Sequence, residues 1–327
     1  MLSVLLPYRD VVTTVRDALS SVLDDLEPDD EVVAIDDGSS DGSAAEVRAL
    51  ADSRIVHVNS GGVGIVGALG RGLAVARGEL VARMDGDDVS LRGRFEASRA
   101  ALASDVSLGV VAVAAEPFGE VGPGLARYVA WQNGLVTNAD HANAIFVESP
   151  LCHPATTLRR AALDAVGGYR ESPWAEDYDL WLRLHAAGFG IAKVPTVLFR
   201  WRIHGASLTW TDPRYAPERH RAARAFYLAQ WLRRSAIPSF GIWGAGQTGR
   251  RLARALEAEG ARPSFFVDID PKKVGRRARG VPIENAEVGM RAGFLVVAVG
   301  AQGARDIVRA RLESHGRVEG RDYVCAA

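Results

Sequence analysis

Short apolar runs alternate with amphipathic stretches along the first hundred residues. Residues 2–6 form an apolar run that ends at Pro7, and residues 11–26 then carry apolar side chains at helical spacing. The same reading predicts further strands at 31–35, 54–58 and 80–84, and helices at 44–51 and 66–77. Strands that alternate with helices predict an α/β fold with a mostly parallel sheet, covered by helices on both faces.

The pattern is less regular between residues 105 and 212 and restarts near the C-terminus. Helices are expected at 161–166 and 178–187, a loop at 119–124, and one basic helix at 218–234. After Pro238 the strands are predicted at 239–243, 263–268 and 294–299, with a helix at 250–259. We therefore predict a large domain at 1–212, a basic linker helix at 213–236 and a small α/β domain at 237–327.

Composition narrows the class of protein. The 327 residues are 48% apolar and 24% charged, which is ordinary for a globular protein. The net charge of -1 gives no electrostatic reason to expect a nucleic-acid partner. The lysines are Lys193, Lys272 and Lys273, so the first 192 residues hold neither a Walker-type phosphate loop nor a Schiff-base lysine.

The cysteines and the apolar runs bear on location. Cys152 and Cys325 show no paired or metal-binding spacing, and we expect both to be reduced. No apolar run approaches the roughly 20 residues that a membrane span needs, and no signal peptide is recognisable. We expect a cytoplasmic protein.

An acidic pair follows the strand predicted at 31–35. Asp36 and Asp37 can accept hydrogen bonds from a base N–H or a ribose hydroxyl. The sequence Asp-Gly-Ser is also a common connection between a strand and a helix, and the pair taken alone favours that alternative.

Three carboxylates follow the strand at 80–84. Asp85, Asp87 and Asp88 repel one another unless a cation or hydrogen-bond donors neutralise them. Oxygen ligands favour Mg²⁺ or Mn²⁺, which can bridge to phosphates. An acidic helix N-terminus is the alternative, but it does not explain why the run follows a buried strand.

A second acidic motif opens the helix near residue 178. Arg183 lies four positions after Asp179, which predicts a solvated ion pair there. Asp177 lies on the side of Trp181 and has no basic residue four positions on, which makes it the better candidate for a general base. An acid that offsets the helix dipole is the alternative.

Taken together, these motifs resemble the inverting family 2 glycosyltransferases with a GT-A fold. The resemblance extends from near residue 2 to near residue 211. The motifs that carry it are Leu6-Pro7-Tyr8-Arg9, residues 36–43 (DDGSSDGS), 82–88 (ARMDGDD), His153-Pro154, 166–170 (VGGYR), 176–183 (EDYDLWLR) and 199–204 (FRWRIH).

The resemblance implies roles for individual residues. The residues expected to hold the nucleotide sugar are Pro7, Arg9, Asp36, Asp37, Arg71 and Asp85, with Asp85 at the ribose. Asp87 and His204 would hold Mn²⁺ or Mg²⁺ at the diphosphate, and Asp177 would be the base. Trp174 and Glu176 are weaker candidates for acceptor contacts.

Two positions depart from the family pattern. Leu91-Arg92-Gly93-Arg94 stands where members often have Leu-Pro-x-Arg, and Gly70 stands before Arg71-Gly72 where members often have Asn. Neither removes a group that the chemistry needs, although the second bears on donor contacts.

The C-terminal domain carries the outline of a dinucleotide fingerprint. Gly244, Gly246 and Gly249 follow a strand and open a helix, and Asp268 comes 19 residues after Gly249 at the end of the next strand. It resembles small Rossmann-like domains, and it is too short to supply a dehydrogenase with its own acid or base. A degenerate module for packing or self-association is the alternative.

The sequence thus predicts a metal-dependent inverting glycosyltransferase that uses a nucleotide sugar, with UDP as the expected nucleotide. Its acceptor would be a glycan or a lipid-linked glycan. The basic helix leaves peripheral contact with the inner face of a membrane open. A protein from another class, a non-catalytic nucleotide or NAD binder acting through the C-terminal domain, is the alternative.

Overall fold

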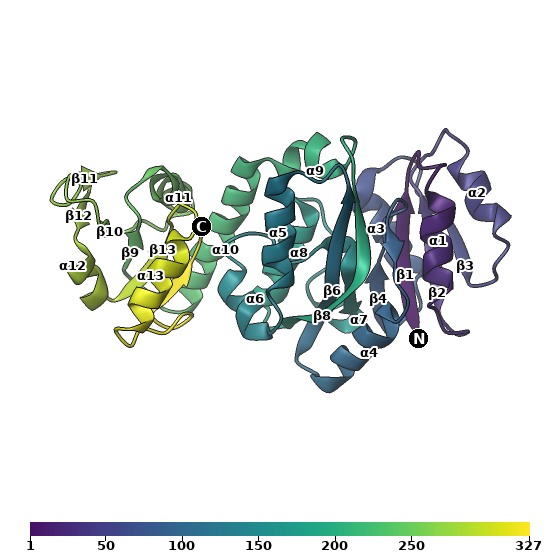
Figure 1. The fold of residues 1–327 in the computed structure, drawn as a ribbon, viewed down its shortest axis with the longest axis horizontal. Coiled ribbons are helices and arrows are strands. Elements are labelled where there is room, and N and C mark those ends of the chain that lie inside the picture. Colours follow the sequence, from purple (N-terminus) through teal and green to yellow (C-terminus); the bar gives the residue numbers. More distant parts are fainter. The chain divides into compact units, whose positions relative to one another are not determined.

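The computed structural model describes every residue from 1 to 327, and the chain divides into two compact units. The first unit contains Met1–His141 and Pro150–Pro213. The second contains Ala142–Ser149 and Arg214–Ala327 (Figure 1). The role of residues 213–236 as a linker stays a prediction. None of the helices is both long and apolar enough to cross a membrane.

The first unit is built around one eight-stranded sheet. Its strands are β1 (Leu2–Tyr8), β2 (Glu31–Asp36), β3 (Ile55–Asn59), β4 (Leu80–Arg83), β5 (Val89–Ser90), β6 (Leu108–Gly119), β7 (Thr156–Arg159) and β8 (Gly190–Ile203). The strand order is β3-β2-β1-β4-β7-β6-β8-β5. Strands β1 to β4 pair in parallel, as do β6 and β8, whereas β7 and β5 run antiparallel to their neighbours.

Helices cover the sheet of this unit. They are α1 (Val15–Leu23), α2 (Ser43–Ala49), α3 (Gly64–Val75), α4 (Arg94–Ser104), α5 (Pro123–Asn133), α6 (Asn138–Ala144), which runs across the unit boundary, α7 (Arg160–Ala165), α8 (Glu176–Ala186) and α9 (Leu208–Thr211). Short 3₁₀ turns lie at His153–Ala155 and Pro213–Tyr215. The α/β class with a mostly parallel, helix-flanked sheet is confirmed.

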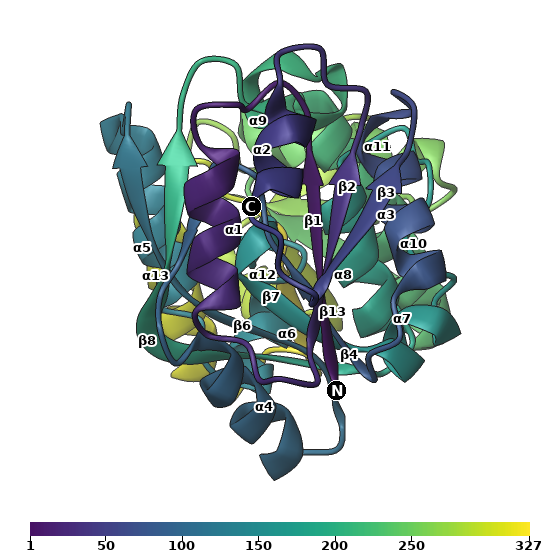
Figure 2. The ribbon, with the colours of Figure 1, turned by 90° about the vertical axis from the view of Figure 1, so that its right-hand side faces the viewer.

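Alternate residues of β1 pack on opposite faces of the sheet. Val4 and Leu6 share a core cluster with the buried face of α1. On the other face, a Cβ added to Gly72 of α3 would lie 2.3 Å from Ile35 and 3.4 Å from Leu5. Because side chains alternate along a strand, α1 and α3 cover opposite faces (Figure 2).

Strands β6 and β8 form a long pair within the stretch whose pattern looked irregular. Their register steps from Val113 opposite Val194 to Ala114 opposite Val197. Pro195 falls in this step, where its missing N–H breaks no ladder bond. The sequence pattern did not predict this strand, because Pro195 interrupts it.

The second unit has a smaller sheet of six strands. They are β9 (Phe240–Trp243), β10 (Phe265–Val267), β11 (Arg277–Ala278), β12 (Val281–Glu284), β13 (Phe294–Val297) and β14 (Tyr323–Cys325). Their order is β11-β12-β10-β9-β13-β14, and every pair except β11–β12 is parallel. The helices of this unit are α10 (Pro217–Arg234), α11 (Gln247–Ala258), α12 (Ala286–Arg291) and α13 (Ala304–Glu313).

Candidate functional site

The parallel strands of the first unit end at one edge of its sheet. In both views the carboxyl ends of β1 and β2 lie at the upper end of this unit, which also holds α9 (Figures 1 and 2). Tyr8 is paired with Asp36 at this edge. Open α/β sheets bind ligands beyond the carboxyl ends of their strands, so this edge is the candidate site.

Asp37 is held inside the protein by the loop after β3. Its Oδ1 accepts hydrogen bonds from Ser60 Oγ at 2.6 Å and from the Val63 N–H at 2.9 Å. Its Oδ2 accepts one from the Gly64 N–H at 2.9 Å, at the start of α3. The side chain is buried, with 7% of the residue exposed. Asp37 therefore fixes the N-terminus of α3, while its predicted nucleotide contact stays a prediction.

Asp36 is half-buried at the same edge. Its Oδ1 accepts a hydrogen bond from the Ser39 N–H at 2.8 Å, which is the turn predicted for this pair. Ser60 donates its N–H to the Asp36 carbonyl and accepts a bond from Arg71. Ser60 therefore connects Asp36 and Arg71, both of which are predicted to hold the nucleotide sugar.

Pro7 and Arg9 are also predicted to hold the nucleotide sugar. Pro7 pairs with Ile35 within the sheet, whereas Arg9 is exposed and lies 3.8 Å from the Asp10 carboxylate. Burial, followed by the negative charge of Asp36, raises the pKa of Tyr8 to about 12, so this phenol stays protonated.

Each of the three carboxylates after β4 has its own ion-pair or hydrogen-bond partner. Asp85 Oδ1 lies 2.7 Å from Arg83 Nη2. Asp87 Oδ2 lies 2.8 Å from His204 Nε2, which the resemblance had implied as a second metal ligand. Asp88 Oδ1 accepts the Arg202 N–H at 2.7 Å. The partners come from β4, from β8 and from His204 just after β8, so this contact set joins segments that are far apart in the sequence.

Burial and neighbouring carboxylates raise the pKa values of Asp87 and Asp88. Burial, and next the charge of Asp85, raises the pKa of Asp87. Burial, and next Asp85 and Asp87, raises the pKa of the fully enclosed Asp88 well above its usual range. The Asp88 Oδ2 atom is buried and has no hydrogen-bond partner. This concentration of acceptors is the environment that a divalent cation would neutralise.

The side chains of Asp87 and His204 are suitable ligands for a divalent cation that also binds phosphate. Asp87 and His204 offer one carboxylate oxygen and one imidazole nitrogen, and no cluster of three or more His, Cys, Asp or Glu side chains is gathered as ligands. Mg²⁺ and Mn²⁺ are commonly held by one or two carboxylates with substrate phosphates and water completing the shell.

Two acids in the first turn of α8 have different surroundings. Asp179 is fully buried and accepts hydrogen bonds from Arg170 Nε at 3.0 Å, Arg183 Nε at 2.7 Å and Trp174 Nε1 at 3.0 Å. The predicted ion pair with Arg183 is confirmed, but its predicted solvation is wrong, because Arg170 and Trp174 close over Asp179. Trp174 thus has a structural contact, and its acceptor role stays a prediction.

Asp177 and Glu176 lie beside this cluster. Asp177 is half-buried, and its Oδ1 accepts a hydrogen bond from the Tyr178 N–H at 2.7 Å. Glu176 is buried, with 2% exposed. Of these two acids, Asp177 is the more accessible to an acceptor, as a general base must be.

Two groups at the site gave no clear signal in the sequence. Buried Arg83 pairs with Asp85, and the guanidinium groups of Arg200 and Arg202 lie over the Phe118 ring, with centroid distances of 4.5 and 4.6 Å. The stacked arginines hold the end of β8, two residues before His204. An alternating Arg-Trp-Arg run was the one available signal.

Comparison with known proteins now places the chain in a family. The profile described as "Glycosyl transferase family 2" matches residues 3–167, half of the chain. The chain belongs to glycosyl transferase family 2. It is a glycosyltransferase that uses nucleotide-sugar donors, and the α/β architecture agrees with this assignment.

Similar proteins and solved structures agree with the assignment to this family. The chain is 26% identical over 235 residues to an Escherichia coli "UDP-Gal:alpha-D-GlcNAc-diphosphoundecaprenol beta-1,3-galactosyltransferase", covering 68% of this chain and 82% of the relative. S. aureus TarS 1-349 in complex with UDP-GlcNAc shares the fold with a TM-score of 0.56 at 18% identity, over 80% and 82% of the two chains. The mannosyltransferase PcManGT from Pyrobaculum calidifontis, in complex with GDP-Man and Mn²⁺, gives 0.51 at 19% identity, over 80% and 73%.

The second unit of this glycosyltransferase has the glycine turn that the sequence showed. Gly244 has a φ of +123°, and a Cβ on Gly249 would lie 1.8 Å from the Gly244 carbonyl oxygen. No atom lies within 4 Å of a Cβ built on Gly246. Chain packing therefore requires two of these glycines and leaves the third unconstrained.

Asp268 of the glycosyltransferase is occupied by its own chain. Its Oδ2 accepts bonds from the Ala245 N–H and Lys273 Nζ, each at 3.0 Å, and its Oδ1 accepts the Asp270 N–H at 3.0 Å. The predicted contact of this carboxylate with a ribose stays a prediction.

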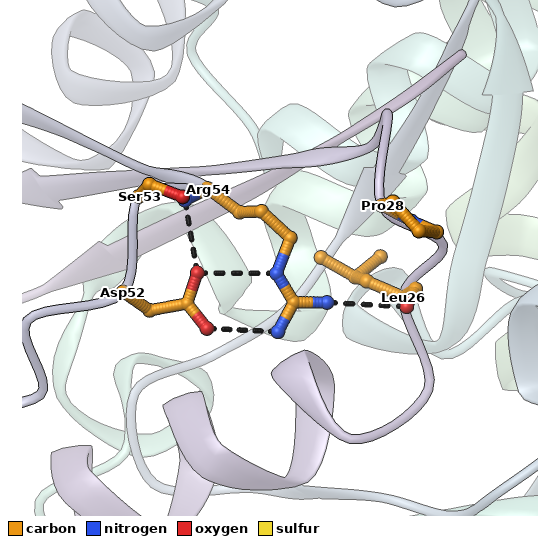
Figure 3. Close-up of a pocket in the computed structure, with 5 residues that line it drawn as sticks. All are labelled: Leu26, Pro28, Asp52, Ser53 and Arg54. Atoms are coloured by element: carbon orange, nitrogen blue, oxygen red, sulfur yellow. Dashed lines mark hydrogen bonds and ion pairs between the residues drawn. The ribbon is translucent and has the colours of Figure 1, made fainter.

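A hollow of about 490 Å³ lies away from the carboxylates, lined by Leu26, Pro28, Asp52, Ser53 and Arg54 (Figure 3). These residues come just before β2 and β3, so they lie at the amino ends of the strands. Arg54 binds Asp52 and the Leu26 carbonyl across it. The hollow belongs to the edge of the sheet opposite the candidate site.

Proposed function

We propose that this chain is a metal-assisted, inverting glycosyltransferase that transfers a sugar from a UDP-sugar to a hydroxyl of a glycan or lipid-linked acceptor. The observation that carries the proposal is the pairing of Asp87 with His204 beside Asp85, on the edge where the parallel strands end. UDP is favoured because the Escherichia coli relative is named for UDP-Gal and the TarS structure contains UDP-GlcNAc. The same relative is named for a diphosphoundecaprenol acceptor.

The donor would lie across the ends of β1, β2 and β4. Asp36 would accept a hydrogen bond from the base, and Asp85 would accept one from a ribose hydroxyl. Arg71, through Ser60, would fix the loop that borders the nucleotide. Pro7 and Arg9 would form the wall that β1 contributes, and Asp37 would act by holding the loop at Val63.

Asp87 and His204 would hold Mn²⁺ or Mg²⁺, and the ion would offset the negative charge that builds on the leaving diphosphate. The PcManGT structure contains Mn²⁺, which supports this assignment. Arg202 keeps His204 in place through the bond from its Nε to the Asp87 carbonyl at 2.7 Å.

Asp177 would act as the general base. Its carboxylate takes the proton of the acceptor hydroxyl while that oxygen forms a bond to the anomeric carbon. The bond from this carbon to the diphosphate oxygen breaks in the same step, so the electron pair leaves with UDP and the configuration inverts. Glu176 and Trp174 lie next to the base, where an acceptor sugar would pass.

The second unit would be a Rossmann-like packing module, with residues 213–236 as the linker. Asp268 supports packing rather than NAD binding, because its oxygens already accept bonds from the chain. On α10, Arg219, Arg233 and Arg234 are exposed, which supports peripheral contact with an anionic membrane. Arg224 of the same helix does not belong to this exposed set, since its side chain is buried against the carbonyls of Val147 and Ala326.

Thermal unfolding with UDP, with and without Mn²⁺, tests the proposal. A ligand at one hundred times its Kd adds roughly 2.7 kcal/mol to the free energy of unfolding, a shift that is easily measured. We expect stabilisation by UDP that requires Mn²⁺ and is lost in Asp87→Ala. Equal stabilisation by UDP without metal would reject the metal-assisted form, and stabilisation by NAD alone would move the working site to the second unit.

A further inference from the structure

Arg94, the first residue of α4, is a fully buried arginine. Its Nη2 donates hydrogen bonds to the Arg83 carbonyl at 2.6 Å and to the Pro154 carbonyl at 2.7 Å. Its guanidinium lies over the rings of Phe95 and Phe199, with centroid distances of 5.0 and 4.8 Å. Burial lowers the pKa of Arg94 to about 10, so the group stays charged at neutral pH. The partners of this buried cation are thus carbonyls and aromatic rings rather than a carboxylate.

The two carbonyls that Arg94 binds lie where β4 and β7 separate. The ladder between these antiparallel strands ends with Ala82 opposite Thr157. Arg83 comes next along β4, and Pro154 lies in the 3₁₀ turn just before β7. Two carbonyls cannot bond to each other, and a buried carbonyl without a donor is costly. Arg94 supplies that donor, so it bridges the two segments beyond the last pair of the ladder.

The side chains proposed to hold the metal ion follow the ends of β4 and β8. Asp87 comes four residues after Arg83, and His204 comes directly after β8. Strands β7 and β6 stand between β4 and β8 in the sheet, so no ladder joins these two strands. Arg94 contacts both of them, through the Arg83 carbonyl of β4 and the Phe199 ring of β8. It therefore links, from the protein interior, the two segments whose side chains meet as Asp87 and His204.

We propose that Arg94 is a positioning residue that sets the geometry of the metal ligands Asp87 and His204. The inference rests on the proposed function, in which these two side chains hold Mn²⁺ or Mg²⁺ at the diphosphate. Without the bridge the Arg83 carbonyl is free to shift, and the acidic segment after it moves relative to β8. Groups that hold metal ligands in place from outside the coordination shell typically change metal affinity ten- to a hundredfold.

Calorimetric titration of Mn²⁺ into the full chain with saturating UDP tests the proposal. We expect Arg94→Met to raise the half-saturating Mn²⁺ concentration ten- to a hundredfold. Transfer from a UDP-sugar should show the same shift in the Mn²⁺ concentration for half-maximal rate, with most of the rate recovered at saturating Mn²⁺. A merely structural defect would instead lower the rate at every Mn²⁺ concentration, because fewer molecules would be folded.

Arg159→Met is the matched control for loss of an arginine that binds carbonyls. The guanidinium of Arg159 binds the carbonyls of Leu108 and Leu102. Arg159 is paired with Leu80, at the other end of the β4–β7 ladder from the acidic segment. Whatever stability this control loses, we expect its half-saturating Mn²⁺ concentration to match that of the wild type.

Arg94→Lys guards against a methionine variant that does not fold. Its ammonium keeps the positive charge near the two rings, but it is a compact group and cannot reproduce the planar guanidinium that bridges both carbonyls. We expect Arg94→Lys to bind Mn²⁺ more weakly than the wild type and more tightly than Arg94→Met.

The outcomes separate the two proposals. Wild-type Mn²⁺ affinity in every Arg94 variant that folds, or an equal loss in Arg159→Met, overturns the positioning role and leaves the proposed function standing. A wild type whose UDP binding and sugar transfer do not respond to Mn²⁺ overturns the metal-assisted function, and the positioning role with it.

Discussion

Asp177 and Asp179, both in the first turn of α8, differ in their burial and in the number of hydrogen-bond partners that hold their carboxylates. Asp179 has two arginines and an indole N–H around it and is fully buried, whereas Asp177 is half-buried beside the Tyr178 N–H. We therefore predict that Asp177→Asn lowers the rate of sugar transfer by about 10²–10⁴, the usual contribution of a general base, with little change in Tm. Initial rates with a UDP-sugar and thermal unfolding measure the two effects.

Asp179→Asn is the control and should do the reverse. Asp179→Asn removes the carboxylate charge that buried Arg183 and Arg170 both bind, which costs about 3–5 kcal/mol of stability. If Asp177→Asn retains wild-type rates, or if Asp179→Asn alone abolishes transfer in a stably folded protein, the assignment of the base is wrong.

A buried histidine makes the first unit sensitive to acid. His141 is fully buried, and burial, followed by the charge of Lys193, lowers its pKa from 6.5 to about 3. Between pH 6.5 and about pH 3 the unfolded chain binds a proton at His141 that the folded protein does not. The free energy of unfolding therefore falls as the pH falls, by up to about 1.4 kcal/mol per pH unit. We predict that His141→Phe flattens this part of the pH profile, measured by urea unfolding. The same change at exposed His57 should leave the slope unaltered, and an unaltered slope in His141→Phe would contradict the prediction.

At the scale of elements, one carboxylate sets where α3 begins. Asp37 comes from the end of β2, yet it accepts the N–H groups of Val63 and Gly64, which a helix cannot satisfy internally. In Asp37→Asn the amide loses the charge and turns an NH₂ group toward these donors. We predict a loss of about 1–3 kcal/mol in the free energy of unfolding, measured by urea, together with weaker UDP binding because the loop before α3 moves.

The control for this change is Asp24→Asn at the exposed end of α1, which should alter neither quantity. Loss of UDP affinity in Asp37→Asn without any loss of stability would indicate direct contact with the nucleotide instead of loop positioning.

The alternating pattern was enough to predict the strands at β1, β2 and β4 and the class of fold. The long β6–β8 pair escaped because Pro195 lies in a register step, and a proline in isolation argues against a strand. The acids of the site were recognisable by type and order. Their partners were not, since the contact of Asp37 with Ser60 and that of Asp87 with His204 depend on how distant strands pair.

The whole molecule contains two units with mostly parallel sheets, and each could in principle hold a nucleotide at its strand ends. In the second unit the place that a ribose would need is filled: Lys273 and the Ala245 N–H already bind Asp268 Oδ2. We therefore predict that UDP with Mn²⁺ slows amide exchange only in the first unit, at residues 36–40, 60–64 and 85–88. NAD should slow exchange in neither unit, including the turn at 244–249.

Hydrogen exchange with mass spectrometry on the intact chain reads both units in one experiment. Lys273→Ala is the informative variant, because it removes the cation from Asp268 while leaving the glycine turn unchanged. If NAD protects residues 244–249 in this variant but not in the wild type, the lysine is what closes the second site. Protection by NAD in the wild type would instead make the second unit a working nucleotide site, since a ribose hydroxyl would then have displaced Lys273 from the carboxylate.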